Sequence, residues 1–374
     1  MVGTRPEAIK MRPIAAAIHE IGAIDQSIIL TGQHRGLARF FGFLPPGSIA
    51  RLSLDPAEQS AGELRDAVHL ALCPKLDRRR HDLVLVQGDT ASAYGGALAS
   101  HDRGVPLGHV EAGLRSFDPL QPWPEESYRV AIDGLADLLF APSEAAAANL
   151  RREHGVRGAI HMTGNTGIDA VIAARGTLPP PIRVKNGRRL ILLTCHRREN
   201  RGDPLRRVAA AARRLVETLP VRITVPLHPS PPMRAAQTEL LGGVPHIRLV
   251  EPLRHEAMVA AMEASWLVLS DSGGLQEEAP ALGRPLLLLR ELTERPEVIE
   301  AGAAALVGTD PDRIVAAVSR LHADPAAYAR MAEPAYPYGR GDAGPRIAAL
   351  IEQFLARPPA ERRPAVPLPC PADP

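Results

Sequence analysis

The sequence predicts an α/β fold with two Rossmann-like domains, each built on a parallel sheet, and three observations lead to this prediction. Short apolar runs alternate with Ala-rich stretches of helical length, as in DLVLVQGDT followed by ASAYGGALAS, and this alternation is typical of βαβ units. A Pro-rich segment at 175–187 separates two such series. A chain of 374 residues also exceeds the size of one ordinary core, which favours two domains.

The elements of the first domain, expected at 1–170, follow this rhythm in order. GTRPEAIKMRPIAAAI is typical of the loop and helix after a first strand, yet only Met1 and Val2 precede it. We therefore expect a truncated first strand; a fold that begins with a helix is the alternative. DLVLVQ and DLLFA predict further strands, and Ser143 with Glu144 predicts the start of the helix after DLLFA.

The second domain, expected at 171–344, repeats the pattern. RLILLT and WLVLS predict strands, and a polar cluster follows each of them. Beyond a last helix near 345–357, the segment 358–374 is dense in proline and has no hydrophobic periodicity, so we expect a disordered tail there.

Composition and charge exclude several classes of partner. The formal net charge is +2, so no chain-wide field favours nucleic acid or a membrane surface. Aromatic residues make up 3% of the chain, too few for base-stacking platforms. No apolar stretch approaches the ~18 residues of a membrane span, and no signal peptide precedes the opening segment. The widely spaced Cys73, Cys195 and Cys370 fit a reducing cytoplasm, which is the expected location.

The polar clusters stand at the carboxyl ends of the predicted strands, where open α/β sheets bind their ligands. In SDSGGLQEEAP, Gly273 and Gly274 let the backbone approach a ligand, and the helix that follows offers N–H groups to an anion. Ser272 adds a hydroxyl, and Glu278 is placed to accept hydrogen bonds from a ribose. A diphosphate explains this combination; an ordinary Ser/Gly helix start with solvated acids is the alternative.

Cationic and imidazole side chains occur at two further turns of this kind. Arg5 and Lys10 lie at a loop-to-helix turn, and both suit phosphate, although surface Arg and Lys are common. His196 directly follows RLILLT, which favours a functional role over a hydrogen-bonded loop residue. Cys195 is interpreted as a small packed residue, since no sequence feature marks a base for it.

Three carboxylates are candidates for acid–base chemistry. Asp89 in VQGDT and Glu111 in HVEAGLRS end strand-like runs at the same edge, and Glu125 begins a helix behind Pro124. Carboxylates gathered in one cleft can hold separated pKa values, so that one acts as acid and another as base. The alternative for Glu125 is a first-turn carboxylate paired with Arg129.

Two motifs are excluded as cofactor or metal signals. GRGDAG at 339–344 matches GxGxxG but follows AYPY rather than a strand, so it does not predict a nicotinamide site. His109 and Glu111 have HxE spacing without a second ligand cluster in the sequence, so we expect no catalytic metal.

Ten segments of the sequence follow the order of one known family. They are GTRPEAIK, TGQH, QGDT, HVEAGLRS, PWPEE, GNTGIDA, HRREN, SDSGGLQEEAP, TERPE and PYG. From residue 3 to about 355, the chain resembles the bacterial non-hydrolysing UDP-N-acetylglucosamine 2-epimerases. The resemblance implies a glycosyltransferase-B-like fold with a cleft between the two domains, and a last helix that returns to the first domain.

The resemblance also implies an activity: reversible inversion at C2 between UDP-GlcNAc and UDP-ManNAc, with no cofactor, in a homodimer. UDP leaves to give 2-acetamidoglucal and adds back after protonation of the opposite face. On this basis Asp89, Glu111 and Glu125 are acid–base candidates, and His196 steadies the departing UDP. The positions that match substrate-binding residues of the family are Arg5, Lys10, Arg129, Ser272, Gly273, Gly274, Glu278 and Arg295.

Three other functions compete with this one. A hydrolysing epimerase would release free ManNAc and UDP, but its members usually depart from the HVEAGLR and PWPEE patterns, which are present here. A glycosyltransferase of the same fold would leave C2 unaltered. A non-enzymatic nucleotide-sugar-binding protein would take up no deuterium at C2.

Overall fold

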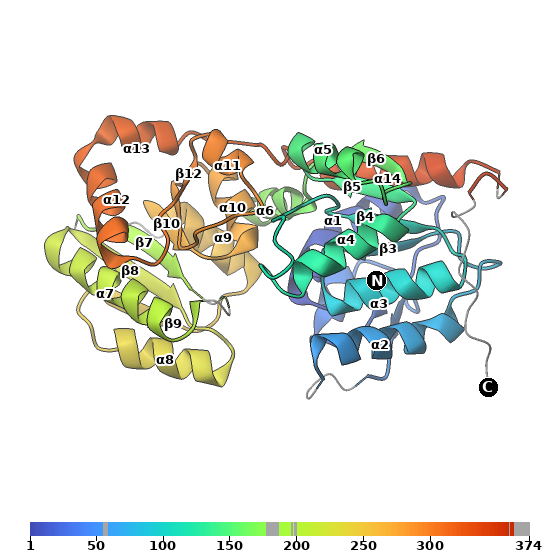
Figure 1. The fold of residues 1–374 in the computed structure, drawn as a ribbon, viewed down its shortest axis with the longest axis horizontal. Helices are drawn as coiled ribbons and strands as arrows, with labels where there is room; N and C mark the ends of the chain where they lie inside the picture. The colour runs from blue at the N-terminus through green and yellow to red at the C-terminus, as the bar shows by residue number, and fades with distance from the viewer. Residues whose placement is uncertain (55–58, 177–186, 196, 198–199, 359, 363–374) are drawn as a thin grey trace. The chain divides into compact units, whose positions relative to one another are not determined.

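The computed structural model describes residues 1–54, 59–176, 187–195, 197, 200–358 and 360–362 (Figure 1). The chain divides into two compact units, one formed by Met1–Ala170 with Tyr338–Pro374 and the other by Val171–Pro337. The second unit therefore ends at Pro337, and the expected range of 171–344 extended too far. His196, the greater part of the Pro-rich segment at 175–187 and most of the expected tail lie outside the described residues.

The first unit contains parallel strands with helices between them. One sheet has the order β3-β4-β5-β6, and a two-stranded sheet pairs β1 with β2. Val2 forms a parallel bridge with Leu30 of β1, and the Met1 amino group donates to the Leu85 carbonyl of β3 at 2.7 Å. Met1 and Val2 therefore occupy the position between the two sheets. The strands are β1 (Ile28–Leu30), β2 (Ile49–Arg51), β3 (Val84–Gln87), β4 (Leu107–Val110), β5 (Leu138–Ala141) and β6 (Ala159–Met162).

Side-chain caps start several helices of the first unit. Thr4 caps α1, Ser60 and Glu63 form a capping box at α2, and Thr90 caps α3. The predicted cap at Ser143 is confirmed, because its hydroxyl accepts from Ala146 N at 3.2 Å. The helices are α1 (Arg5–Ile21), α2 (Ala61–Leu72), α3 (Ala91–Asp102), α4 (Glu125–Leu135), α5 (Glu144–Arg152) and α6 (Thr166–Arg175), with 3-10 turns η1 (Leu37–Phe41) and η2 (Cys73–Lys75).

The last helix, α14 (Ala343–Leu355), belongs to the first unit and packs on α1. Its apolar face, which includes Ile347, Ile351 and Phe354, is buried in the same core cluster as the α1 side chains. Asp169 accepts hydrogen bonds from Ala343 N and Gly344 N at 3.3 and 2.7 Å, which satisfies two N–H groups at the start of α14. GRGDAG is thus the turn that enters this helix.

The second unit is a six-stranded parallel sheet in the order β12-β11-β10-β7-β8-β9. This is the doubly wound order, whose crossover direction reverses between β7 and β10. The unit's strands are β7 (Arg189–Thr194), β8 (Val221–Pro226), β9 (Ile247–Val250), β10 (Leu267–Ser270), β11 (Leu286–Leu288) and β12 (Ala304–Leu306). Its helices are α7 (Asp203–Thr218), α8 (Pro231–Leu241), α9 (His255–Ala264), α10 (Gly273–Ala281), α11 (Glu297–Glu300), α12 (Pro311–Ala323) and α13 (Pro325–Met331).

Each unit has its own apolar core of strand and helix side chains. The two sets of parallel strands confirm the predicted α/β class. Among the described residues, no helix combines the length and the apolar character that crossing a membrane requires.

Candidate active site

In the first unit, the expected site residues gather at the carboxyl edge of the sheet. The loop after Val2 leads into α1 with Arg5 and Lys10, the loop after β3 carries Asp89, and Glu111 directly follows β4. The N-terminus of α4 brings Glu125, and its second turn brings Arg129. Ligands bind at this edge because the strand ends leave loops and helix N-termini around one crevice.

Glu111 is held by two partners that lie far from it in sequence. Lys10 Nζ lies 2.8 Å from each carboxylate oxygen, and Gln87 of β3 also donates to Oε2. The Glu111 side chain is 8% exposed, so the pair with Lys10 is largely removed from water. A charge-assisted contact of this kind fixes the position of a carboxylate.

The backbone of Glu111 is in the left-handed region, with a φ of 70°. Such a conformation costs a non-glycine residue on the order of 1 kcal/mol or more, and it persists where surrounding contacts impose it. The contacts here are hydrogen bonds of 3.1 Å from the backbone N–H groups of Glu111 and Ala112 to the Phe140 carbonyl of β5. The turn therefore directs the carboxylate toward Lys10 at a conformational cost.

Arg129 connects the loop after β3 to helix α4. Its Nε lies 3.1 Å from Asp89 Oδ2, and its Nη1 lies 3.0 Å from Glu126 Oε2. Glu126 is buried and also accepts from the backbone N–H groups of Ser116 and Phe117 at 3.1–3.2 Å. Sequence analysis chose Glu125 and missed Glu126, which holds the loop between β4 and α4. The apolar face of α4 was the signal that could have separated the two residues.

His109 and Asp133 connect the loop after β3 to the loop after β4. His109 Nδ1 lies 2.5 Å from Asp133 Oδ1, and its Nε2 lies 2.9 Å from the Gly88 carbonyl. Asp133 Oδ2 accepts from Gly113 N at 3.1 Å and from Arg115 at 2.6 Å. Burial alone would raise the pKa of Asp133, but the charges and hydrogen bonds of His109 and Arg115 lower it below its usual value.

These contacts decide the role of the HxE motif. Both ring nitrogens of His109 lie within hydrogen-bond distance of protein oxygens, one from Asp133 and the other from the Gly88 carbonyl. His109 is therefore a buried positioning residue.

Arg5 occupies the first position of α1, with its side chain exposed. Its backbone N–H donates to His34 Nδ1 at 3.1 Å. Burial, assisted by the charge of Arg5, lowers the pKa of His34. The start of α1 is fixed by Glu7, which accepts from Gly3 N at 2.7 Å and from the Thr4 hydroxyl at 2.9 Å.

In the second unit, the expected residues lie where the order of the sheet reverses. The ends of β7 and β10 are neighbours there, with Thr194 and Ser270 in register and their hydroxyls 2.7 Å apart. The buried Asp271 follows β10 and accepts from Arg197 N at 2.8 Å and from Asn200 at 2.9 Å. Arg197 and Asn200 are thereby anchored to the residue that precedes the first turn of α10.

Helix α10 begins at Gly273 with Ser272 as its N-cap. A methyl group built on Gly273 would lie 3.3 Å from Arg295 Nη1 and 3.4 Å from Arg197 Nη2. Two guanidinium groups therefore stand beside the first N–H groups of a helix, and both features attract an anion. Gly274 lies on the same turn, with Glu278 Oε1 3.5 Å from the position of its missing side chain.

Buried carboxylates hold these arginines in place. Arg295 is 6% exposed; its Nε lies 2.5 Å from Glu277 Oε1, and its Nη1 contacts Glu294. Glu294 also accepts from Arg290 at 2.9 Å, and Arg197 Nη2 lies 3.6 Å from it. Burial and the charges of Arg197 and Arg295 lower the pKa of Arg290. Glu278 instead faces His255, whose Nε2 lies 3.9 Å from Oε1.

Sequence analysis missed Glu277, Glu294 and Arg290. For the two carboxylates the signal was present in TERPE and QEEAP, because a buried arginine requires a carboxylate partner and each segment supplies one. The expected residues thus form two groups, one in each unit: Arg5, Lys10, Asp89, Glu111, Glu125 and Arg129 in the first, and Ser272, Gly273, Gly274, Glu278 and Arg295 in the second.

Comparison with known proteins gives one consistent result. The family profile described as UDP-N-acetylglucosamine 2-epimerase matches residues 16–352. The UDP-N-acetylglucosamine 2-epimerase of Bacillus subtilis is 38% identical over 360 residues, which cover 94% of this chain and 93% of that protein.

Solved structures agree with this result. The UDP-GlcNAc 2-epimerase from Neisseria meningitidis bound to UDP-GlcNAc is similar with a TM-score of 0.87 and 34% identity, over 94% of this chain and 98% of that one. A glycosyltransferase from Streptomyces nogalater, at 16% identity and a TM-score of 0.60 over 92% of this chain and 95% of that one, shares the fold alone. The glycosyltransferase-B-like fold is therefore shown.

Proposed function

The chain belongs to the UDP-N-acetylglucosamine 2-epimerase family, and from that premise we propose that it interconverts UDP-GlcNAc and UDP-ManNAc without hydrolysing either. A base takes the C2 proton while the C1–O bond to UDP breaks, which gives 2-acetamidoglucal and UDP. UDP then adds back at C1 while an acid delivers a proton to the opposite face of C2. The two steps are redox-neutral and consume no water.

The first unit supports the proton transfers. Glu111 is a buried carboxylate whose position is fixed by Lys10 and Gln87, and Asp89 is fixed by Arg129. With Glu125, these are the groups proposed to remove and return the proton at C2. This pair of loops is braced by His109 and Asp133, so their spacing resists relaxation during the reaction.

The second unit supports the binding and departure of UDP. The N-terminus of α10, with Ser272, Gly273 and Gly274, and the guanidinium group of Arg295 supply donors and positive charge for a diphosphate. Glu278 is proposed to accept hydrogen bonds from the ribose. Arg5 and Lys10 are the proposed contributions of α1 to substrate binding, and His196 is proposed to steady the departing UDP.

The observation that carries the proposal is the environment of Glu111 in a chain of this family. Glu111 is a carboxylate in a left-handed turn, buried against a lysine at the ligand-binding edge of a sheet. The end of a strand does not require such a residue for structural reasons. Removal of the C2 proton, which no adjacent carbonyl group acidifies, does require such a group.

Incubation with UDP-GlcNAc in deuterated water, followed by proton NMR, tests the proposal. The expected result is loss of the C2 proton signal and the appearance of UDP-ManNAc with deuterium at C2. Free ManNAc with UDP would replace the proposal by the hydrolysing reaction. If C2 keeps its proton and its configuration, the remaining candidate functions are a glycosyltransferase and a binding protein. Assembly as a homodimer is also part of the proposal, and sedimentation equilibrium tests it.

A further inference from the structure

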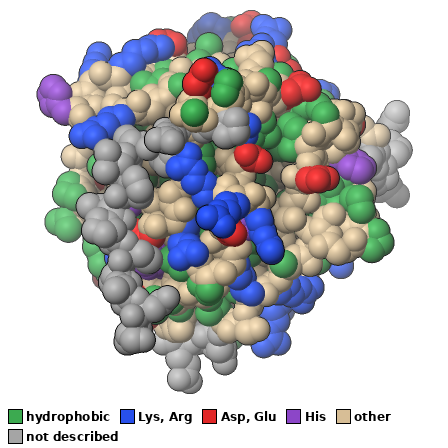
Figure 2. Space-filling view, turned by 90° about the vertical axis from the view of Figure 1, so that its right-hand side faces the viewer, with side chains coloured by type: hydrophobic (Ala, Val, Ile, Leu, Met, Phe, Trp, Pro, Cys, Tyr) green, Lys and Arg blue, Asp and Glu red, His purple; other side chains and the backbone are tan. Residues whose placement is uncertain are grey.

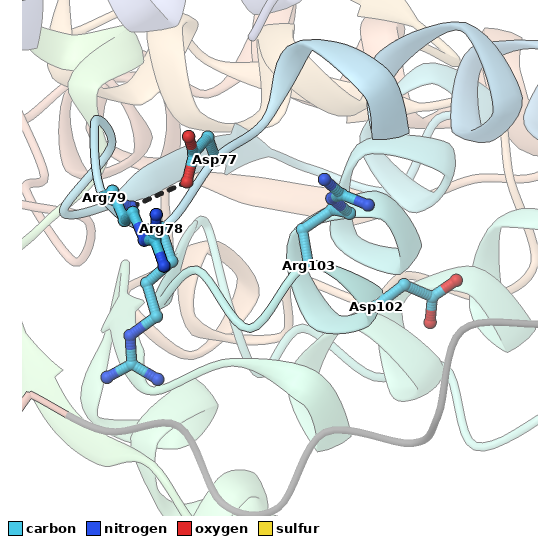
Figure 3. Close-up of a pocket in the computed structure, with 5 residues that line it drawn as sticks. All are labelled: Asp77, Arg78, Arg79, Asp102 and Arg103. Atoms are coloured by element: carbon cyan, nitrogen blue, oxygen red, sulfur yellow. Dashed lines mark hydrogen bonds between the residues drawn. The ribbon is translucent and has the colours of Figure 1, made fainter. Parts of the chain in front are cut away.

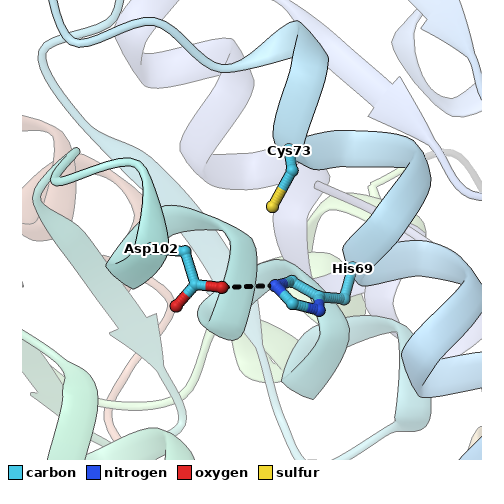
Figure 4. A group of neighbouring side chains, drawn as sticks. All are labelled: His69, Cys73 and Asp102. Atoms are coloured by element: carbon cyan, nitrogen blue, oxygen red, sulfur yellow. Dashed lines mark hydrogen bonds and ion pairs between the residues drawn. The ribbon is translucent and has the colours of Figure 1, made fainter. Parts of the chain in front are cut away.

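His69, Cys73 and Asp102 form a compact group of side chains in the first unit (Figure 4). We propose that these three side chains bind a zinc-class divalent metal ion that cross-links α2 to α3. The group shares no residue with the machinery of the proposed function, so the two proposals stand or fall separately.

Local structure brings the three residues together. His69 and Cys73 are four residues apart at the end of α2, where the Cys73 N–H donates to the His69 carbonyl, so both side chains leave the same face. Asp102 is the last residue of α3, and α2 and α3 pack against each other along their lengths. Metal ligands at this spacing on a helix reach one ion without a change of backbone.

The distances suit a tetrahedral ion. All three potential ligand atoms lie within 4.8 Å of one another, and His69 Nε2 lies 2.7 Å from Asp102 Oδ2. Bond lengths of about 2.0–2.3 Å to Zn²⁺ place tetrahedral ligands roughly 3.3–3.8 Å apart. Binding therefore requires shifts of about 1 Å at the ends of side chains, with the His69–Asp102 hydrogen bond replaced by two metal bonds.

The chemical nature of the ligands selects the ion. A thiolate and an imidazole suit zinc and its transition-metal neighbours, whereas magnesium and calcium require oxygen ligands. The Cys73 thiol gives up its proton to solvent on binding, and water completes the fourth position. The charges of Cys73 and Asp102 together balance those of a divalent ion.

The site is open to solvent from one side. The His69 and Asp102 side chains are 22% and 17% exposed. Asp102 also lines a pocket of about 460 Å³ together with Asp77, Arg78, Arg79 and Arg103 (Figure 3). Lys and Arg side chains gather at the middle of the face drawn in Figure 2. Of the three pocket arginines, Arg103 donates to the Leu76 carbonyl at 3.1 Å, and all three are solvent-exposed, so water screens their repulsion of a cation.

The proposed site lies away from the acid–base groups. Helix α3 begins beside Asp89 at the carboxyl edge of the sheet and ends at Asp102. Eleven residue steps of about 1.5 Å separate the two ends of the helix by roughly 17 Å. An ion at His69, Cys73 and Asp102 would therefore stabilise the packing of α2 on α3 without touching the substrate.

Cobalt binding to the full chain tests the proposal. The protein is stripped with a chelator and titrated with Co²⁺, which gives a thiolate charge-transfer band in the near ultraviolet when a cysteine is a ligand. The expected result is a band at one equivalent, displaced by Zn²⁺. Cys73→Ser is expected to abolish it, and His69→Gln and Asp102→Asn to weaken metal binding at least about tenfold.

Matched variants separate this site from the other thiols. Cys370→Ser and Cys195→Ala are expected to keep the band, and all variants of the three ligands to retain C2 exchange. In the unmutated chain, Zn²⁺ is expected to slow the alkylation of Cys73 at least tenfold, as measured by peptide mass spectrometry. The alkylation rate of Cys370 is expected to stay the same. No band, a band that survives Cys73→Ser, or equal protection of all cysteines would overturn the proposal.

Discussion

Asp133 and His109, both fully buried, are joined by a hydrogen bond of 2.5 Å that braces the two loops of the expected acid–base groups. His109 reaches the carbonyl of Gly88, next to Asp89, and Asp133 reaches the N–H of Gly113, two residues after Glu111. The pair thus fixes the two loops where the chemistry is proposed to residues of the buried core.

Asp133→Asn is expected to lower the free energy of unfolding by about 3–5 kcal/mol, because it removes the buried counter-charge of Arg115 and the carboxylate that contacts His109. Urea unfolding followed by circular dichroism measures this loss. Asp66→Asn removes one partner of an exposed pair with Arg65 and is expected to cost less than about 1 kcal/mol. Equal costs for the two substitutions would show that the Asp133 network contributes no more than a surface pair.

The same carboxylate predicts how stability depends on pH. Its pKa is lower in the folded chain than the value of about 3.9 of an unfolded aspartate, so the folded state favours the ionised form. The stabilisation from Asp133 is therefore complete above about pH 4 to 5 and is lost as the pH falls through the lowered folded pKa. The difference in unfolding free energy between wild type and Asp133→Asn should shrink on acidification; a constant difference from pH 7 to pH 3 would contradict the assignment.

The elements that sequence analysis predicted well depend on local signals. Ser143 caps its helix as predicted, and WLVLS ends at the turn that opens α10, because apolar runs, caps and glycines act within a few residues. The fold class followed from the alternation of these signals.

Contacts between distant segments were not predictable in this way. Lys10 and Glu111 are 101 residues apart, and nothing in either motif states that they meet. The choice of Glu126 over Glu125 as the buried residue depends on which face of α4 packs inward. The neighbouring positions of β7 and β10 arise from the strand order, which short-range patterns do not determine.

Glu111→Gln is expected to slow deuterium exchange at C2 by about 10²- to 10⁴-fold, the usual contribution of a general acid or base. The amide keeps the size of the side chain and removes its ability to take a proton. UDP affinity, measured by calorimetry, should change little, because the substitution leaves the proposed diphosphate site at the start of α10 unaltered. Glu144→Gln, at an exposed position on α5, is the control and should keep full exchange. Exchange within threefold of wild type in Glu111→Gln would remove Glu111 from the mechanism.

Gly273→Ala tests the proposed anion site at the start of α10. The added methyl group would lie 3.3 and 3.4 Å from the guanidinium nitrogens of Arg295 and Arg197, in the space proposed for a diphosphate. We expect UDP affinity to fall at least about tenfold, which corresponds to about 1.4 kcal/mol.

The stability of the fold should not fall with Gly273→Ala, because alanine is about 0.5–1 kcal/mol better than glycine within a helix. Gly62→Ala, in α2, is the matched control: no atom lies within 4 Å of the added methyl group, so the same intrinsic gain should appear with unchanged UDP affinity. If Gly273→Ala binds UDP as tightly as Gly62→Ala, the diphosphate does not approach the start of α10, and the arginines beside Gly273 serve only to pair with Glu277 and Glu294.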